Sequence, residues 1–229
     1  MKMKMKMKTI LITQAYNPQN KAREEELKVT LQNNISDKSI DRVLLLVTED
    51  ISNELIDDPK VNVIKIYHRP TYFDLFDNIN KYKEEMYSEE ECLLITANSD
   101  IYFHEKAIDL MKREITDDNA LILSRWDHTV DGLVHLNGSD SQDVWAVKNR
   151  YKPGSYDIIQ GLPGCDNRIA AELQNAGYVL SNPSLDIKAI HYHYEQYNTY
   201  LGIPSLLGEY AFLFPHAMIN KEQSGEKPK

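Results

Sequence analysis

Apolar runs and amphipathic stretches alternate along the first half of the chain. Short apolar runs predict strands at Thr9–Thr13, Arg42–Val47, Val61–Tyr67, Cys92–Ala97 and Ala120–Ser124. Between these runs, apolar residues recur at three- and four-residue spacing, which predicts helices over 21–35, 72–86 and 104–115. Runs as continuously apolar as Arg42–Val47 are typical of a sheet that is covered on both faces. The alternation therefore predicts an α/β fold with a central, mainly parallel sheet flanked by helices.

The pattern becomes less regular after Trp126. Polar turns separate brief strands such as Asp143–Lys148, one clear helix is expected over 166–176, and a further strand over 185–193. We expect residues 9–220 to form a single domain, with an α/β half over 9–125 and a small mixed half over 126–220. Residues 1–8 alternate Met and Lys, and residues 221–229 are polar, so we expect both ends of the chain to be disordered.

Composition and charge argue against several classes of protein. The chain of 229 residues carries 35 Asp and Glu against 26 Lys and Arg, a formal net charge of −9. This balance argues against nucleic-acid partners, because phosphate contacts need clustered Lys and Arg. No run of 18 apolar residues occurs, so we expect no membrane span, and Met1–Lys8 lacks the apolar region of a signal peptide. Cys92 and Cys165 make no disulfide framework, which fits a cytoplasmic protein.

A polar segment, Asn98-Ser99-Asp100, directly follows the predicted strand Cys92–Ala97. Ligands of open α/β sheets bind beyond the carboxyl ends of the strands, so a carboxylate at this position is well placed for chemistry. Asp100 is a hard oxygen ligand that suits Mg²⁺ or Mn²⁺. The alternative is that the segment only turns the chain or caps the helix that begins near His104.

Two histidines, His191 and His193, stand two residues apart in the last predicted strand. Residues two apart in a strand share a face, so both imidazoles can face one site. A lone His-x-His pattern is a weak indication of a metal site, and no Cys/His quartet for structural zinc is present.

Asp166 begins the helix that follows the tight loop Gly161–Gly164. One interpretation makes this carboxylate the general base that takes a proton from an attacking hydroxyl group. The other makes it a helix N-cap, which would lower its pKa and weaken it as a proton acceptor. Arg125, Asp127 and Asp143 stand beside the two tryptophans of the chain, Trp126 and Trp145, and packing alone does not explain these charges.

Several familiar signatures are missing from the sequence. There is no Walker A motif and no G-x-G-x-x-G motif, so the common Gly-rich phosphate loops are absent. There is also no G-x-S-x-G motif, which argues against a serine hydrolase of that type.

Seven segments, taken together, resemble a known family. They are ITQAYNPQ, HRPTYFDLF, LLITANSDIYF, LSRWD, SQDVWAV, GLPGCDNRIAAELQNAGY and SNPSLDIKAIHYH, and they span about Ile10 to His193. In this order the segments resemble GT-A fold glycosyltransferases that use nucleotide-diphosphate sugars, in particular small glycosyltransferase domains of large DNA viruses and bacteria. The resemblance implies the GT-A fold, with a nucleotide-binding half over 9–125 and an acceptor and catalytic half over 126–220.

The resemblance also implies roles for particular residues. The donor-binding set would be Thr13, Ala15, Tyr16, Asn17, Arg69, Tyr72, Asp74, Asn98, Ser99 and Arg125. Asn98-Ser99-Asp100 takes the place of the Asp-x-Asp motif, with Asn98 departing from its first Asp and Asp100 matching the metal-holding second Asp. A late histidine would be a further metal ligand, with His191 the better match and His193 its competitor. Asp166 falls where inverting members carry the base, and Asp143 is the reserve candidate.

The implied function is transfer of a sugar from a nucleotide-diphosphate donor to a hydroxyl group of a glycan or another acceptor. UDP is the expected nucleotide because it is the commonest donor nucleotide in the fold, and one base without an obvious nucleophile favours inversion. Mn²⁺ or Mg²⁺ would stabilise the departing diphosphate, and an acidic protein needs such a cation to bind an anionic donor.

Two alternatives stay open. Asn98, as a departure from the motif, is compatible with a catalytically silent domain that binds sugar nucleotides or glycans. A sugar nucleotidyltransferase fits less well, because such enzymes usually have a Gly-rich loop with Arg or Lys after the first strand. This chain has Tyr16-Asn-Pro-Gln at that position.

Overall fold

The computed structural model describes residues 7–51, 54–192 and 203–218. Within these residues the main sheet has seven strands in the order β10-β6-β9-β4-β1-β2-β3. Their bounds are β1 Lys8–Ala15, β2 Arg42–Val47, β3 Val61–Lys65, β4 Cys92–Ala97, β6 Asn119–Leu123, β9 Val144–Lys148 and β10 Val179–Ser181. A smaller sheet has the order β5-β11-β7-β8, with β5 Ile101–Phe103, β7 Arg125–Thr129, β8 Gly132–His135 and β11 Ala189–His191.

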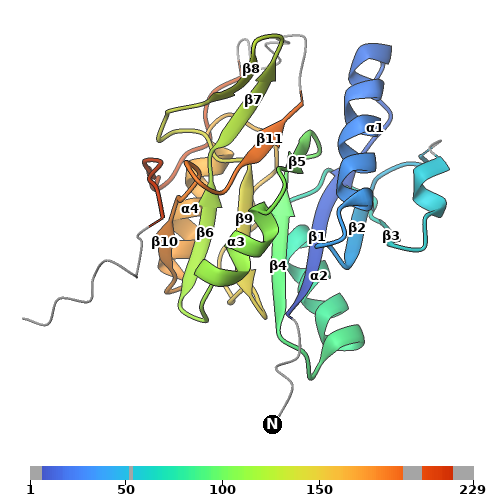
Figure 1. Ribbon diagram of the computed structural model, residues 1–229. Coiled ribbons are helices and arrows are strands. Elements are labelled where there is room, and N and C mark those ends of the chain that lie inside the picture. Colours follow the sequence, from blue (N-terminus) through green and yellow to red (C-terminus); the bar gives the residue numbers. More distant parts are fainter. Residues whose placement is uncertain (1–6, 52–53, 193–202, 219–229) are drawn as a thin grey trace, which may run out of the picture.

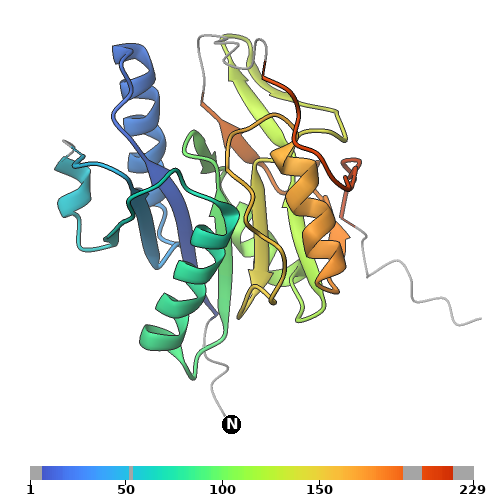
Figure 2. The same ribbon diagram turned by 180° about the vertical axis from the view of Figure 1, so that it is seen from behind.

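Four α-helices and one short 3-10 helix, η1, accompany the sheets in the described part of the chain. They are α1 Lys21–Ser36, α2 Tyr72–Tyr87, α3 Ala107–Glu114, α4 Cys165–Asn175 and η1 Glu54–Asp57. Helices α1 and α3 cover one face of the main sheet (Figure 1), and α2 and α4 cover the other (Figure 2). None of the helices described is long and apolar enough to cross a membrane.

The main sheet is mostly parallel, which confirms the fold class expected from the sequence. β1 pairs in parallel with β2 and β4, β2 with β3, and β6 with β10. Among the described strands of the main sheet, only β9 runs against its neighbours, β4 and β6. Because β1 and β4 run in the same direction, the residues after Ala15 and Ala97 meet at one edge of the sheet.

The core explains why the strands are so continuously apolar. Along β1, Leu11 packs in the cluster that includes residues of α1 and α3, whereas Ile10 and Ile12 pack in the cluster that includes residues of α2 and α4. Successive side chains of a strand point to opposite faces, so a sheet covered on both sides needs apolar residues at every position. All three of these side chains are fully buried.

Most predicted elements are present with shifted ends. β2 and β4 have the predicted bounds, α2 extends one residue past the prediction, and the predicted strand over 185–193 is reduced to Ala189–His191. β1 includes Lys8, which we expected in a disordered end, while residues 1–6 and 219–229 lie outside the described residues. The pattern did not indicate η1, β5, β7, β8 or β10, which are all five residues or shorter.

The small sheet sits at the carboxyl-terminal edge of the main sheet (Figure 1). β11 lies between β5 and β7, antiparallel to the first and parallel to the second. The register places His191 opposite both Ile101 and Asp127. This pairing brings β11 beside β5, in the segment that follows β4.

Candidate active site

A large cleft opens where β1 and β4 end, next to the small sheet. Its volume is about 1370 Å³. Of the residues predicted for the site, it is lined by Ala15, Tyr16, Arg69, Asn98, Ser99, Asp100, Arg125, Asp143 and His191. A second cavity of about 330 Å³ adjoins it and is lined by Thr13 and Asn17, among others. Ala15, Tyr16 and Ser99 line both, so the two spaces are neighbours.

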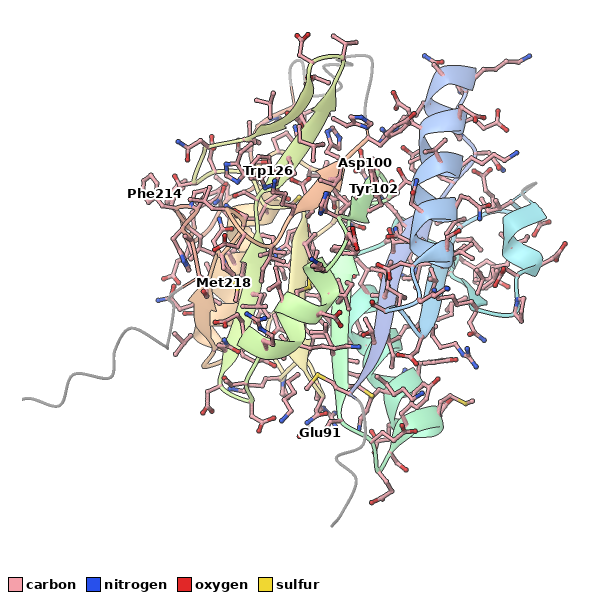
Figure 3. All side chains as sticks on the ribbon, viewed as in Figure 1. Glu91, Asp100, Tyr102, Trp126, Phe214 and Met218 are labelled. Carbon is pink, nitrogen blue, oxygen red and sulfur yellow. The ribbon has the colours of Figure 1, made fainter. Side chains whose placement is uncertain are left out.

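Asp100 and His191 are in direct contact in the cleft. His191 Nε2 lies 3.2 Å from Asp100 Oδ2, and His191 Nδ1 lies 2.9 Å from Asp127 Oδ1. Burial lowers the pKa of His191, but hydrogen bonds to the two carboxylates outweigh it and raise the pKa to about 9. The imidazole is therefore protonated at neutral pH and donates to Asp100 and Asp127. Figure 3 labels Asp100 beside Tyr102, between α1 and the small sheet.

Arg23 is the residue of this cluster that sequence reasoning missed. Its Nη2 lies 2.6 Å from Asp100 Oδ2, across 77 positions of sequence. Burial raises the pKa of Asp100, but His191 and Arg23 together hold it well below its ordinary value. The one local signal is that Arg23 stands in the first turn of α1, where a positive charge opposes the helix dipole.

The structure decides between the two interpretations of Asp100. The N-cap position of α3 is Lys106, and no side chain caps that helix. The backbone N–H of Ile101 donates to the Asn98 carbonyl, so the segment does turn the chain, while the Asp100 carboxylate bonds to the two cations. Asp100 is thus a charged group of the cleft and not a cap.

A second group of polar side chains joins this cluster to Asp143. Arg125 Nε donates to Asp127 at 2.9 Å and its Nη1 to Asp143 at 3.4 Å. Asn98 Nδ2 donates to Asp143 Oδ1 at 2.8 Å, and Asn98 Oδ1 accepts from Gln160 at 2.9 Å. A continuous series of charged and polar contacts therefore runs from Arg23 to Asp143 along one wall.

Asp166 lies at the start of α4 without capping it, and it is not among the residues that line the two cavities. The N-cap is Gly164, in the left-handed conformation at φ 79°, and no side chain bonds to that end of the helix. Burial, followed by the nearby charge of Asp143, raises the pKa of Asp166 to about 7. Burial also raises the pKa of Asp143, so the two carboxyl groups titrate as a pair. The thiol of Cys165 donates to Asp166 Oδ1 at 3.2 Å.

Tyr72 and Asp74, which we expected in the nucleoside pocket, lie elsewhere. Tyr72 is fully buried, with its ring edge-on to Trp145 at 4.9 Å between centroids and its hydroxyl 3.7 Å from Cys165 Sγ. Asp74 forms a capping box with Thr71 at the start of α2 and contacts His68. Tyr72 packs on the buried face of α2, and the Asp74 carboxylate accepts a hydrogen bond from the backbone N–H of Thr71 at the start of the helix. Tyr72 has no exposed surface and does not line the cleft, so we correct its placement. Asp74 is not a lining residue either, but it contacts His68, which lines the cleft.

The cleft residues fit a divalent cation in their donor chemistry. Asp100 offers a carboxylate oxygen, and His191 Nε2, 3.2 Å away, becomes a nitrogen ligand once it gives up the proton that it donates to Asp100. No group of three or more His, Cys, Asp or Glu able to hold a metal ion occurs in the described residues. The other ligands of an ion held there would have to come from the bound substrate and water. His193 lies outside the residues that the structure describes.

Comparison with known proteins identifies the fold. No protein-family model and no curated protein sequence matches the chain. The chain is similar to the structure of a mannosyltransferase from Pyrobaculum calidifontis in complex with GDP-Man and Mn²⁺, with 8% identity and a TM-score of 0.51. That match covers 82% of this chain and 58% of the mannosyltransferase, so this chain spans little more than half of its length.

Two further solved structures match less closely. A putative nucleotide-diphospho-sugar transferase from Desulfovibrio desulfuricans is 9% identical with a TM-score of 0.47, over 77% of this chain and 80% of that one. A 4-diphosphocytidyl-2C-methyl-D-erythritol synthase from Anaerococcus prevotii is 16% identical with a TM-score of 0.42, over 63% and 70%. The chain has a nucleotide-diphospho-sugar transferase fold of the GT-A type, as its resemblance implied.

Proposed function

We propose that this protein is a metal-dependent glycosyltransferase. It moves a sugar from a UDP-sugar to a hydroxyl group of a glycan or another acceptor, with inversion at the anomeric carbon. The observation that carries the proposal is the unbroken series of side chains Arg23–Asp100–His191–Asp127–Arg125–Asp143 along the wall of the large cleft. It combines cation-binding groups with carboxylates at the edge of the sheet where ligands of this architecture bind.

The smaller cavity supports a nucleoside site. Thr13, Asn17 and Asn34 line it together with apolar side chains such as Leu31 and Leu45. A mainly apolar space with a few polar groups suits a flat heterocyclic base such as a pyrimidine. We assign Tyr16 and Asn17 to this site as well. Arg69 lines the large cleft, where it donates to the Gln160 and Gly161 carbonyls, and we assign it to donor binding there.

In this proposal Asp100 and His191 hold the cation. A divalent cation held there would supply Lewis-acid stabilisation of the negative charge on the departing nucleoside diphosphate. Ser99 and Arg125 line the same cleft, and their N–H and O–H groups are available to orient the donor. Mn²⁺ or Mg²⁺ is the expected ion, given one carboxylate and one imidazole.

Asp166 is our candidate for the general base, and Asp143 is the reserve. A base works best when its pKa is near the working pH, and the Asp166 carboxyl has a pKa of about 7. Asp143 lines the cleft directly, and its Oδ2 has no partner among the described residues, which supports it as the alternative. Either carboxylate would take the acceptor's proton as its oxygen attacks the anomeric carbon.

Release of UDP from a panel of UDP-sugars with Mn²⁺ tests the proposal. Wild-type protein should release UDP, and Asp100→Ala should release at least about a hundredfold less, because the charge on the diphosphate is then unsupported. Tight binding of UDP-sugars without release under any condition would favour a silent binding domain. Pyrophosphate formed from UTP and a sugar 1-phosphate would instead identify a nucleotidyltransferase.

The organisation and location of the protein are further parts of the proposal. We propose that residues 9–220 act as one domain, because β9 from the second half lies in the middle of the sheet built by the first half. Cys92 and Cys165 are buried free thiols, which supports a cytoplasmic location.

A further inference from the structure

Arg23 occupies the carboxylate oxygen that a metal ion would need. Its Nη2 and His191 Nε2 both contact Asp100 Oδ2, at 2.6 Å and 3.2 Å. The side chains of Arg23 and Asp100 are only 22% and 14% exposed, so little water screens the pair. A cation that took Asp100 and His191 together would compete with the guanidinium for this oxygen.

The rest of the guanidinium is held independently of Asp100. Arg23 Nη1 lies 3.1 Å from Glu26 Oε2, one turn further along α1, and Nε lies 3.4 Å from the Tyr16 hydroxyl. Glu26 is 3% exposed and belongs to the same rigid helix. If Nη2 leaves Asp100, the guanidinium therefore stays at the wall of the cleft, anchored from α1.

We propose that Arg23 is an exchange residue. It neutralises Asp100 while the cleft is empty, gives up that oxygen when the cation arrives, and then donates to the diphosphate of the donor. The inference rests on the proposed function, because it needs a diphosphate ligand. A planar guanidinium with several N–H groups matches phosphate oxygens, and Arg23, Asp100 and His191 line the same cleft.

The charge of the cleft explains why such a residue is needed. Asp100, Asp127 and Asp143 face the positive charges of Arg23, Arg125 and His191 along the wall. Without Arg23, the two carboxylates that contact His191, Asp100 and Asp127, would have less positive charge beside them and would attract the metal ion more strongly. The same change would leave an incoming diphosphate with less positive charge to meet.

Arg23→Gln distinguishes the two roles of Arg23, because it should raise the affinity for Mn²⁺ and lower the affinity for UDP. We expect nucleotide-free Arg23→Gln to bind Mn²⁺ about tenfold more tightly, since a charged hydrogen bond to Asp100 no longer competes. We expect its affinity for UDP at saturating Mn²⁺ to fall about tenfold, since the phosphates lose a charged donor. Titration calorimetry measures both constants without any turnover.

Two further variants make the test specific. Arg23→Lys keeps the charge without the planar fork, so Mn²⁺ binding should stay near wild type while UDP affinity falls in part. Arg113→Gln removes the same charge from an exposed position of α3 and should change neither constant by more than about twofold. Thermal unfolding of each variant shows whether it is folded.

Unchanged or weaker Mn²⁺ binding by folded Arg23→Gln would overturn the exchange, as would full UDP affinity in that variant. A wild-type protein that bound Mn²⁺ but no UDP would refute the proposed donor instead. In that case tighter Mn²⁺ binding by Arg23→Gln would still support the first half of the exchange.

Discussion

Asn98 Nδ2 donates to Asp143 Oδ1 across 2.8 Å, which explains why an amide stands where the related motif has a carboxylate. Asp143 is 3% exposed and contacts Arg125 through the same oxygen. A carboxylate at position 98 would face a buried carboxylate directly, whereas the amide supplies a donor to Asp143 and an acceptor to Gln160.

Asn98→Asp should therefore destabilise the protein. We expect the free energy of unfolding at pH 8 to fall by about 1–3 kcal/mol, because a hydrogen bond is replaced by repulsion between partly buried charges. Urea denaturation at pH 8 and pH 5 measures the change, which should shrink at pH 5 as one carboxyl group takes up a proton. Asn98→Ala, which loses only the hydrogen bond, is the matched control. Equal losses in the two variants at both pH values would contradict the repulsion.

The rate of sugar transfer should fall on the acid side of neutrality. The proposed base, Asp166, has a pKa of about 7 and accepts a proton only in its ionised form. The acid limb of kcat/KM should therefore have a midpoint near pH 7, and Asp166→Asn should keep UDP binding and lose transfer by about a hundredfold or more.

Asp143→Asn tests whether the acid limb of kcat/KM comes from the raised pKa of Asp166. Asp143 is the second cause, after burial, of the raised pKa of Asp166, so removing its charge should move the limb to lower pH. If Asp166→Asn kept near wild-type sugar transfer and Asp143→Asn lost it, the general base would be Asp143.

Asp166 should also make the stability of the fold depend on pH. Its pKa is about 7 in the folded protein and 3.8 ordinarily, so the folded state binds more protons between those values. Stability then falls as pH rises from about 4 to 7, and no cost remains below about pH 4, where both states are protonated. Asp166→Asn removes this loss, so the variant should gain on the order of 4 kcal/mol over wild type at pH 8.

Guanidinium denaturation of wild type and Asp166→Asn from pH 4 to 8 measures this difference. Asp131→Asn, in the exposed turn between β7 and β8, is the matched control and should follow the wild-type curve. A constant difference between Asp166→Asn and wild type across this range would show that the carboxyl group is not perturbed by its site.

Tyr72 should contribute to stability and not to nucleotide binding. Tyr72→Ala should cost about 3–5 kcal/mol of unfolding free energy, because it leaves a cavity against Trp145. Tyr72→Phe keeps the ring and should bind UDP as wild type does in titration calorimetry. Tyr16→Ala, at the junction of the two cavities, should weaken UDP binding under the same conditions. Weaker UDP binding by Tyr72→Phe would restore Tyr72 to the nucleoside pocket.

Local patterning was enough to predict the four α-helices and every described strand of the main sheet except β10. The apolar runs that became β2 and β4 are buried on both faces, so nearly every position reports the same environment. Strands β7 and β8 of the small sheet gave no such pattern, because none of their side chains is buried. Tyr72 was misplaced because an aromatic side chain at a helix start fits a pocket and a core equally well in sequence.

The sequence by itself determined that Asp100 follows a buried strand and that His191 stands in a late strand, because both depend on local apolar runs. Only the tertiary structure decided that these residues meet and that Arg23 joins them. The two contacts span 91 and 77 positions and depend on β11 entering between β5 and β7 and on α1 lying beside the end of β4. Charge pairing over such separations follows strand order and packing, which hydrophobic periodicity does not encode.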